Sequence, residues 1–339
     1  MKTRFLHTKN TSESSSDPPA FSPRKKHLSR FLILTIAALV VVGVLYSVES
    51  YILKENDLGG IFCEEKKEYK TGVQDVFLER KDGTYTYAEM IYPKKYEGAM
   101  PLVVIGHGFK GNLNSGGARE LSQRLAASGT AAIRMDFNPR VAPDPDAKKT
   151  GCYDLNSMKD DMLAAIGYAR GHFEIDAGRI GLYARSMGGR VVMTMANENY
   201  GGYNYRALAM VAPAGNETAM IDYAGGHQAW EKLKKQADAA GAISYQGLKL
   251  SPEWFREFEE YNPCDYGYQF GNKPVLVICN TLDYVVSPDT SKECAAAYEN
   301  SRVIEVTTNN YHGYEMSYKT SELKNYLMGE IVDFFSANL

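Results

Sequence analysis

From about residue 71 to the C-terminus, short apolar segments that favour strands alternate with segments whose apolar residues recur at helical spacing. The first two strand-like segments flank Lys81, Asp82 and Gly83, which is a signal for a β-hairpin. The later strands are wholly apolar, and such strands joined by helices form parallel sheets that are covered on both faces. We therefore expect residues 71–339 to form one α/β domain, a doubly wound and mostly parallel sheet with an antiparallel N-terminal edge.

The alternation predicts where the elements lie. Strands are expected at 73–79, 84–92, 102–105, 130–135, 180–184, 207–211, 274–279 and 302–306. Helices are expected at 118–128, 155–169, 189–198, 291–298 and 321–335.

One long segment interrupts this rhythm. Between Pro213 and Pro274 no strand signal appears, and the segment contains both tryptophans of the chain. It follows the carboxyl end of a predicted strand, which is where ligands bind in open α/β sheets. We predict a helical cap insertion at about 214–270 that covers the functional site; a surface excursion packed by its own aromatic side chains is the alternative.

The N-terminal region predicts a membrane anchor. Residues 31–48 contain no charged side chain, and at about 1.5 Å per residue they are just long enough to cross a bilayer core of roughly 30 Å. Basic residues precede this segment and acidic residues dominate after it, which retains the preceding flank in the cytoplasm. We expect a cytoplasmic basic tail (1–30), a single-pass transmembrane signal-anchor (31–48), a linker (49–70) and an extracytoplasmic domain. A mature N-terminus near residue 50 would instead mean a cleaved signal peptide and a secreted protein.

Composition excludes several other classes of protein. The chain is 44% hydrophobic and 23% charged, which is typical of globular proteins, and its net charge of −3 gives no electrostatic case for binding nucleic acid. Its five cysteines form no C-x-x-C pair, so we expect no structural metal. Export permits a disulfide, but the pairing cannot be read from the sequence. Cys279 ends an apolar strand and is expected to be a small buried side chain.

The most informative motif surrounds Ser186. A predicted strand runs into this serine and a predicted helix begins directly after it, within the sequence Ala-Arg-Ser-Met-Gly-Gly. Such a sharp turn lifts the hydroxyl out of the sheet, and it requires small residues on both sides of the serine. Gly188 meets this requirement, whereas Ala184 stands where glycine is usual. Ser186 is therefore the candidate nucleophile.

Two further candidates follow Ser186 at the ends of later strands. Asp283 lies in the loop after the strand that ends near Cys279, and His312 follows the strand that ends near Val306. A serine hydroxyl needs a base to become nucleophilic, imidazole supplies it, and a carboxylate fixes the imidazole tautomer. The chain order Ser, Asp, His is that of one known triad architecture. Taken singly, Asp283 could instead cap a loop, and His312 could be a surface or core residue.

A glycine-rich loop at residues 106–112 follows the strand at 102–105. Its position suits the first donor of an oxyanion hole, so we assign this role to the backbone N–H groups of Phe109 and Met187. His107 is expected to brace the loop. The same glycines could cradle a phosphate, but no Gly-Lys-Ser/Thr follows them.

On these residues the chain from about Val73 to the C-terminus resembles the α/β-hydrolase superfamily, and within it bacterial feruloyl/cinnamoyl esterases and serine-aminopeptidase-like hydrolases. The matching stretches are HGFKGN (107–112), RMDFN (134–138), ARSMGG (184–189), VAPAGN (211–216), KPVLVICNTLDYVVSP (273–288) and NNYHGY (309–314). Two stretches depart from the family pattern. Residues 139–142 replace the usual Gly-His-Gly-x-Ser, and Asn280 stands where the family has glycine. The first departure alters a loop that borders the acyl site in relatives, so no aromatic-acid preference is carried over.

The residues and the resemblance together predict a membrane-anchored, extracytoplasmic serine hydrolase that cleaves a small-molecule carboxylic ester through an acyl-enzyme, without a cofactor or metal. Two alternatives remain open. A serine peptidase of the aminopeptidase-like type would use the same machinery, and a non-catalytic binding module could keep the fold without the chemistry. The acyl and alcohol groups and the oligomeric state are not predicted.

Overall fold

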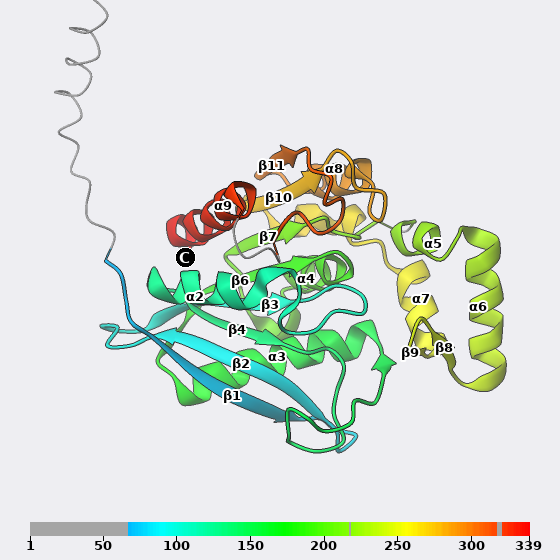
Figure 1. Cartoon of the computed structure of the whole chain (residues 1–339), viewed down its shortest axis with the longest axis horizontal. Helices are drawn as coiled ribbons and strands as arrows, with labels where there is room; N and C mark the ends of the chain where they lie inside the picture. The colour runs from blue at the N-terminus through cyan, green and yellow to red at the C-terminus, as the bar shows by residue number, and fades with distance from the viewer. Residues whose placement is uncertain (1–66, 217, 317–320) are drawn as a thin grey trace, which may run out of the picture. The chain divides into compact units, whose positions relative to one another are not determined.

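The computed structural model describes residues 67–216, 218–316 and 321–339 (Figure 1). The predicted basic tail, the predicted signal-anchor and most of the predicted linker lie outside these residues. No helix of the described part combines the length and the apolar character needed to cross a membrane.

The centre of the domain is an eight-stranded sheet in the order β1-β2-β4-β3-β6-β7-β10-β11. The strands are β1 (Thr71–Glu79), β2 (Tyr85–Pro93), β3 (Met100–Gly106), β4 (Ala131–Met135), β6 (Ile175–Arg185), β7 (Ala207–Val211), β10 (Val275–Asn280) and β11 (Ser301–Val306). The six strands from β4 to β11 are mutually parallel, while β1 and β2 form an antiparallel hairpin at one edge. The predicted doubly wound sheet with an antiparallel N-terminal edge is confirmed.

Helices cover both faces of this sheet (Figure 1). The long helices of the body are α2 (Ala118–Ala127), α3 (Leu155–His172), α4 (Met187–Glu198), α8 (Pro288–Ala296) and α9 (Glu322–Asn338), with short 3₁₀ turns η1 (Ser115–Gly117) and η2 (Tyr200–Gly202). Successive strand residues point to opposite faces, so Val104 packs with α3 and α4 while Val103 packs with α2 and α9. Side-chain caps fix several starts, as Asp154 does for α3 and Ser321 for α9.

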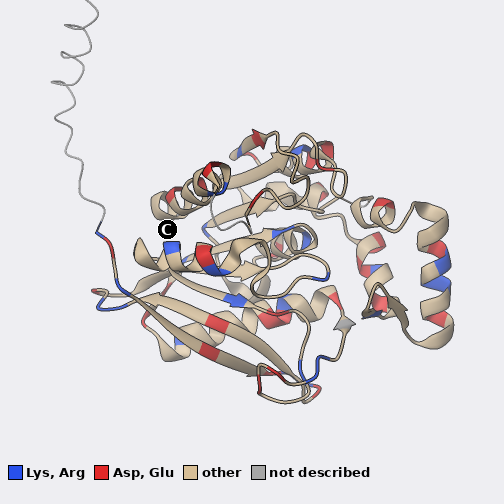
Figure 2. Cartoon of the chain, viewed as in Figure 1, with Lys and Arg blue, Asp and Glu red and all other residues tan. Residues whose placement is uncertain are grey.

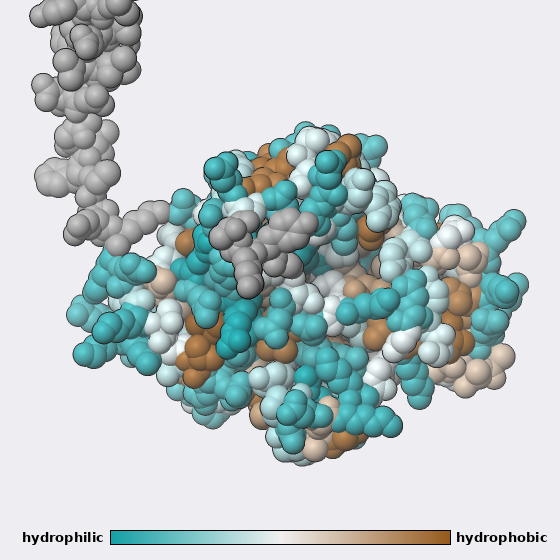
Figure 3. All heavy atoms as spheres, in the orientation of Figure 1, coloured by the Kyte–Doolittle hydropathy of each residue, from teal (hydrophilic) through white to brown (hydrophobic). Residues whose placement is uncertain are grey.

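The segment after β7 leaves the body and returns to it before β10. It comprises α5 (Ala219–Tyr223), α6 (His227–Ala240), β8 (Ile243–Tyr245), β9 (Leu248–Leu250), α7 (Pro252–Glu260) and η3 (Pro263–Phe270). We call residues 219–270 the cap. Its helix α6 carries basic and acidic side chains along its length (Figure 2) and buries only Trp230 and Ala237. In the space-filling view hydrophilic and hydrophobic residues are mixed over both the body and the cap (Figure 3).

The expectation that this segment contains no strand was wrong. β8 and β9 pair through a two-residue turn at Gln246 and Gly247, both of which have positive φ, and β9 also pairs with β5 (Cys152–Tyr153). Strands of two or three residues are too short to show a period. The partner β5 also lies far away in the chain, so only the Gln-Gly turn could have indicated this small sheet.

A single buried arginine fastens the cap to the body. Arg190 lies in the first turn of α4, and its guanidinium donates to the carbonyl oxygens of Gly215 (2.9 Å), Asn216 (3.0 Å), Phe258 (2.9 Å) and Tyr261. It also lies 4.4 Å from the centre of the Phe258 ring. Burial lowers the pKa of Arg190 to about 10, which leaves the side chain protonated at neutral pH. One cation thus joins the segment that leads into the cap, at Gly215 and Asn216, to the end of α7 in the cap.

Replacing Arg190 with Met should lower the free energy of unfolding by about 2–4 kcal/mol, because the substitution strands several buried carbonyl oxygens without a donor. Urea unfolding followed by tryptophan fluorescence reports on the cap, since Trp230 and Trp254 both lie there, and circular dichroism reports on the body. Arg206→Met, at an exposed side chain, is the matched control and should change stability by less than about 0.5 kcal/mol. Equal stabilities for the two variants would show that Arg190 does not fasten the cap.

Candidate active site

Ser186 occupies a strained turn between β6 and α4. Its φ of 53° and ψ of −129° are unusual for a residue with a side chain. The turn is possible because its neighbours are glycines: a Cβ on Gly188 would lie 2.4 Å from the carbonyl oxygen of His107, and one on Gly108 would lie 2.9 Å from the Cβ of Ser186. Ala184 is accommodated, since its methyl group faces Gly106 and Gly188 and needs no more room than they leave.

Asp283 and His312 form a hydrogen-bonded pair. His312 Nδ1 lies 2.8 Å from Asp283 Oδ2, and the Asp283 side chain is fully buried while 27% of the His312 side chain is exposed. Burial alone would raise the pKa of Asp283, but the contacts with His312 and the backbone N–H groups of Val285 and Val286 outweigh it and hold that pKa below its usual value. An ionised Asp283 accepts a hydrogen bond from Nδ1–H of His312, and this tautomer leaves the lone pair of Nε2 free to act as a base.

Ser186 and His312 line one pocket of about 350 Å³, which we call the Ser186 pocket. β3, β6, β10 and β11 each end at this edge of the sheet, so the loops that follow them carry Phe109, Ser186, Asp283 and His312 to the same region. Among the described residues the Ser186 hydroxyl makes no hydrogen bond to His312. In enzymes without a bound substrate such catalytic hydrogen bonds are often long and shorten when substrate binds.

Two backbone amides point to an oxyanion site. Met187 is the first residue of α4, so its N–H has no acceptor within the helix. Phe109 belongs to the loop that packs against Ser186, and in the described part of the chain neither amide donates to another group. His107 braces the loop as expected. Its Nδ1 lies 2.7 Å from the carbonyl oxygen of Gly108, and its Nε2 accepts a hydrogen bond from the N–H of Phe137 at 2.9 Å.

Asn280, which departs from the family pattern, joins the two loops that carry the Asp283–His312 pair. Its side-chain amide is fully buried and donates to the carbonyl oxygens of Thr308 (2.9 Å) and Tyr311 (2.7 Å). Its side-chain oxygen accepts from the N–H groups of Leu282 and Thr308. The departure therefore has a structural role that the sequence reasoning did not assign. A polar residue ending an apolar strand, three positions before the acid, was the available signal.

Two more residues that the sequence reasoning missed position this pair. The Tyr314 hydroxyl donates to Asp283 at 3.1 Å and accepts from the N–H of Asn280 at 2.9 Å. Arg185, directly before Ser186, donates through its guanidinium to the carbonyl oxygen of His312 at 2.7 Å. Arg185 therefore ties the Ser186 turn to the His312 loop. Both residues lie in stretches that match the family, ARSMGG (184–189) and NNYHGY (309–314), but only the three-dimensional structure shows what their side chains contact.

The cap reaches the oxyanion loop through aromatic side chains. The ring of Phe109 lies 5.7 Å from that of Trp254, 5.9 Å from Tyr223 and 6.3 Å from Tyr245, all measured between ring centres. The ring of Tyr153, in β5, lies 5.8 Å away. We call these four rings the aromatic cage. Three of the four rings belong to the cap, so the cap contacts the loop that carries Phe109.

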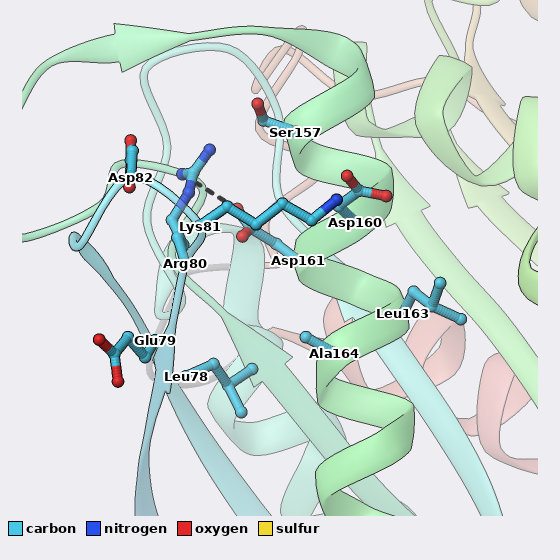
Figure 4. A pocket seen from close by; sticks show the side chains of 10 residues that line it. All are labelled: Leu78, Glu79, Arg80, Lys81, Asp82, Ser157, Asp160, Asp161, Leu163 and Ala164. Atoms are coloured by element: carbon cyan, nitrogen blue, oxygen red, sulfur yellow. Dashed lines mark hydrogen bonds and ion pairs between the residues drawn. The ribbon is translucent and has the colours of Figure 1, made fainter.

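A second pocket lies between the β1–β2 hairpin and α3, far from Ser186 in the sequence (Figure 4). Two of its charged side chains, Arg80 and Asp161, form an ion pair at 3.4 Å, and Thr86 donates to Asp161 at 2.7 Å. Burial raises the pKa of Asp161 to about 7. No candidate triad residue lines this pocket.

In amino-acid sequence, known proteins match only part of this chain. No family model matches the chain. A stretch of 115 residues is 32% identical to the quorum-quenching protein AidA of Acinetobacter baumannii (strain MDR-ZJ06) and covers 32% of this chain, but the chain spans only about a third (35%) of that relative's length.

Solved structures match over most of the domain. Est1E from Butyrivibrio proteoclasticus has a TM-score of 0.55 and 20% identity over 76% of this chain and 98% of that one. The α/β hydrolase GrgF from Penicillium sp. sh18 has a TM-score of 0.61 and 14% identity over 79% of this chain and 99% of that one. Acetyl xylan esterase from Paenibacillus sp. R4 has a TM-score of 0.56 and 18% identity over 82% of this chain and 86% of that one. The chain has the α/β-hydrolase fold.

Replacing Asn280 with Ala should lower the free energy of unfolding by about 2–3 kcal/mol, since the buried groups that it pairs lose their partners. Because the two loops would no longer be held in register, we also expect a fluorophosphonate probe to label Ser186 at least about tenfold more slowly. Asn300→Ala, at an exposed residue beyond the other end of β10, is the control. Unchanged labelling in a destabilised Asn280→Ala protein would mean that Asn280 supports the fold and not the site.

Proposed function

We propose that this chain, whose domain has the α/β-hydrolase fold, is a serine hydrolase that cleaves carboxylic esters. One observation carries the proposal: the Asp283–His312 hydrogen bond opens onto the same pocket as Ser186, which sits on a strained turn beside two uncommitted amides. This arrangement provides a nucleophile, a base with a fixed tautomer and a site for negative charge. These are the parts that acyl transfer requires.

In the proposed mechanism the Ser186 oxygen attacks the ester carbonyl while Nε2 of His312 takes its proton. Asp283 stabilises the imidazolium that forms. The N–H groups of Phe109 and Met187 bind the oxyanion of the tetrahedral intermediate, and each such donor typically contributes about 3–4 kcal/mol to the transition state. His312 then returns the proton to the departing alcohol, and the acyl-enzyme remains. Water, activated by His312, releases the acid and restores Ser186.

Several structural neighbours are named as ester-cleaving proteins, and this favours an ester over an amide as substrate. They include an esterase domain from a Rhodothermus marinus protein and an acetyl xylan esterase. Another neighbour, Est1E, is known with ferulic acid bound. We do not propose ferulic acid as a ligand of this chain. Residues 139–142 differ from the pattern of the feruloyl esterases that the sequence resembles, and Phe109 fills the aromatic cage.

Replacing Ser186 with Ala should abolish hydrolysis of short-chain p-nitrophenyl esters and labelling by a fluorophosphonate, because no other group in the proposal attacks the carbonyl. Asp283→Asn, which keeps the shape but donates where the carboxylate accepts, should lower kcat by about 10³- to 10⁴-fold. Ser336→Ala, at an exposed position on α9, is the matched control and should retain full activity. Ester hydrolysis that persists in a folded Ser186→Ala protein would refute the mechanism.

The same assays separate the two alternatives. Aminoacyl arylamides tested beside acyl esters would reveal a peptidase if their kcat/KM were the larger. Correctly folded wild-type protein that the fluorophosphonate does not label would indicate a non-catalytic binding module.

We also propose that residues 31–48 anchor the protein in a membrane with the hydrolase domain outside the cytoplasm. The proposal rests on the apolar run and on the basic residues that precede it. The full-length chain should sediment with membranes, resist alkaline extraction and be digested by protease added from the outer side. A chain lacking residues 1–50 should remain in the soluble fraction. A mature soluble protein whose N-terminus lies near residue 50 would contradict the anchor and indicate secretion.

A further inference from the structure

Two cysteines meet where the cap rejoins the body. Cys264 lies in η3, at the C-terminal end of the cap, and Cys294 lies in α8. Their sulfur atoms are 3.1 Å apart although 30 positions separate them in the chain. This is closer than the van der Waals contact of two sulfur atoms, and both residues are free thiols in the structure. Only a small movement separates this contact from a bond of about 2.05 Å.

The packing around the pair keeps the two sulfurs together. η3 and α8 approach so closely that a Cβ on Gly267 would lie 2.3 Å from the carbonyl oxygen of Ala297. On the other side, a Cβ on Gly215 would lie 2.7 Å from the sulfur of Cys294. Cys294 is fully buried, so its sulfur is enclosed between the Gly215 backbone and Cys264.

The backbone of Cys264 is held as well. Its N–H donates to the side chain of Asn262 at 3.1 Å, and Asn262 caps η3. Both ends of the contact are therefore positioned by their own elements and not by each other. A covalent bond between them requires the two sulfur atoms to move closer by about 1 Å.

We propose that Cys264 and Cys294 form a disulfide that fastens the C-terminal end of the cap to α8. The closed loop would contain β10 and Asp283, so the cross-link would restrain the segment that carries one member of the proposed triad. Neither the proposed esterase activity nor the fold requires this bond. An extracytoplasmic location would favour it, because disulfides persist in oxidising compartments.

The reaction is a thiol–disulfide exchange with a small-molecule or protein disulfide as oxidant. Cys264 is half-buried and Cys294 fully buried, so Cys264 meets the oxidant first. Its thiolate attacks one sulfur of the oxidant, and the other sulfur leaves and takes up the proton that Cys264 lost. The Cys294 thiolate then attacks the sulfur of Cys264 and expels the second half of the oxidant, which takes up the proton of Cys294. Two electrons have passed to the oxidant, which ends as two thiols.

The environment makes this exchange slow at neutral pH. The contact with Cys294 and burial together raise the pKa of the Cys264 thiol, so little thiolate is present. Oxidation should therefore be faster at pH 8.5 than at pH 7. Incubation at the higher pH is the condition for the test.

The test incubates the full-length protein with oxidised glutathione at pH 8.5, blocks free thiols with N-ethylmaleimide and maps tryptic peptides without reduction. We expect peptide 293–302 linked to peptide 257–292, the latter spanning both Cys264 and Cys279 because trypsin does not cleave between Lys273 and Pro274. Cys279→Ala is the matched variant that assigns the bond, since it should leave the linked pair intact. Cys264→Ser should abolish the link.

Thermal unfolding supplies a second measurement that does not depend on peptide recovery. Oxidised wild-type protein should melt roughly 5–10 °C above the same protein in dithiothreitol, because the bond closes a loop in the unfolded chain. This difference should vanish in Cys264→Ser and in Cys294→Ser, each compared with its own reduced form, and persist in Cys279→Ala. The proposal is overturned if oxidised glutathione leaves both thiols free for alkylation, or if Cys264 retains glutathione as a mixed disulfide while Cys294 stays reduced.

Discussion

The site depends on the close approach of two backbones at the end of β6. Gly188, in the first turn of α4, lies against the carbonyl oxygen of His107, and no side chain fits between them. This approach lets α4 begin immediately after Ser186 and forces the serine into its unusual backbone conformation. It also brings the loop containing Phe109 beside the serine. One steric constraint therefore places the proposed nucleophile and both proposed oxyanion donors.

The opposite half of the site is held by polar bonds in place of close packing. Asn280, Tyr314 and Arg185 each join segments that are distant in the chain, and all three act on the loops of Asp283 and His312. These bonds are buried or half-buried, where a lost partner is costly. Close packing of the backbone thus holds the Ser186 side of the pocket, and hydrogen bonds hold the His312 side.

Much of the fold could be predicted because apolar periodicity reports burial directly. The eight strands of the main sheet and the long helices of the body follow that pattern. Ser186, Asp283 and His312 could be named together as candidates because each follows a strand that ends at the same edge of the sheet. The sheet of β5, β8 and β9 was missed because its strands are too short to show a period and pair across distant segments. The role of Arg185 was missed because a hydrogen bond between remote loops leaves no local signal. Asn280 did leave a signal, a polar side chain at the end of an apolar strand, but its partners could not be read from the sequence. The anchor and the catalytic roles remain predictions.

The aromatic cage has a consequence for how such a pocket would discriminate between acyl groups. The ring of Phe109 packs among side chains of the cap. Its backbone N–H is one of the two proposed donors to the oxyanion. A ligand that pushes those rings apart would turn the peptide plane of Phe109, and a ligand that leaves them in place would not. The pocket would then discriminate between acyl groups through the rate of acyl transfer more than through binding affinity. The reason is that Phe109 would contact the ligand with its ring and stabilise the negative charge with its backbone N–H.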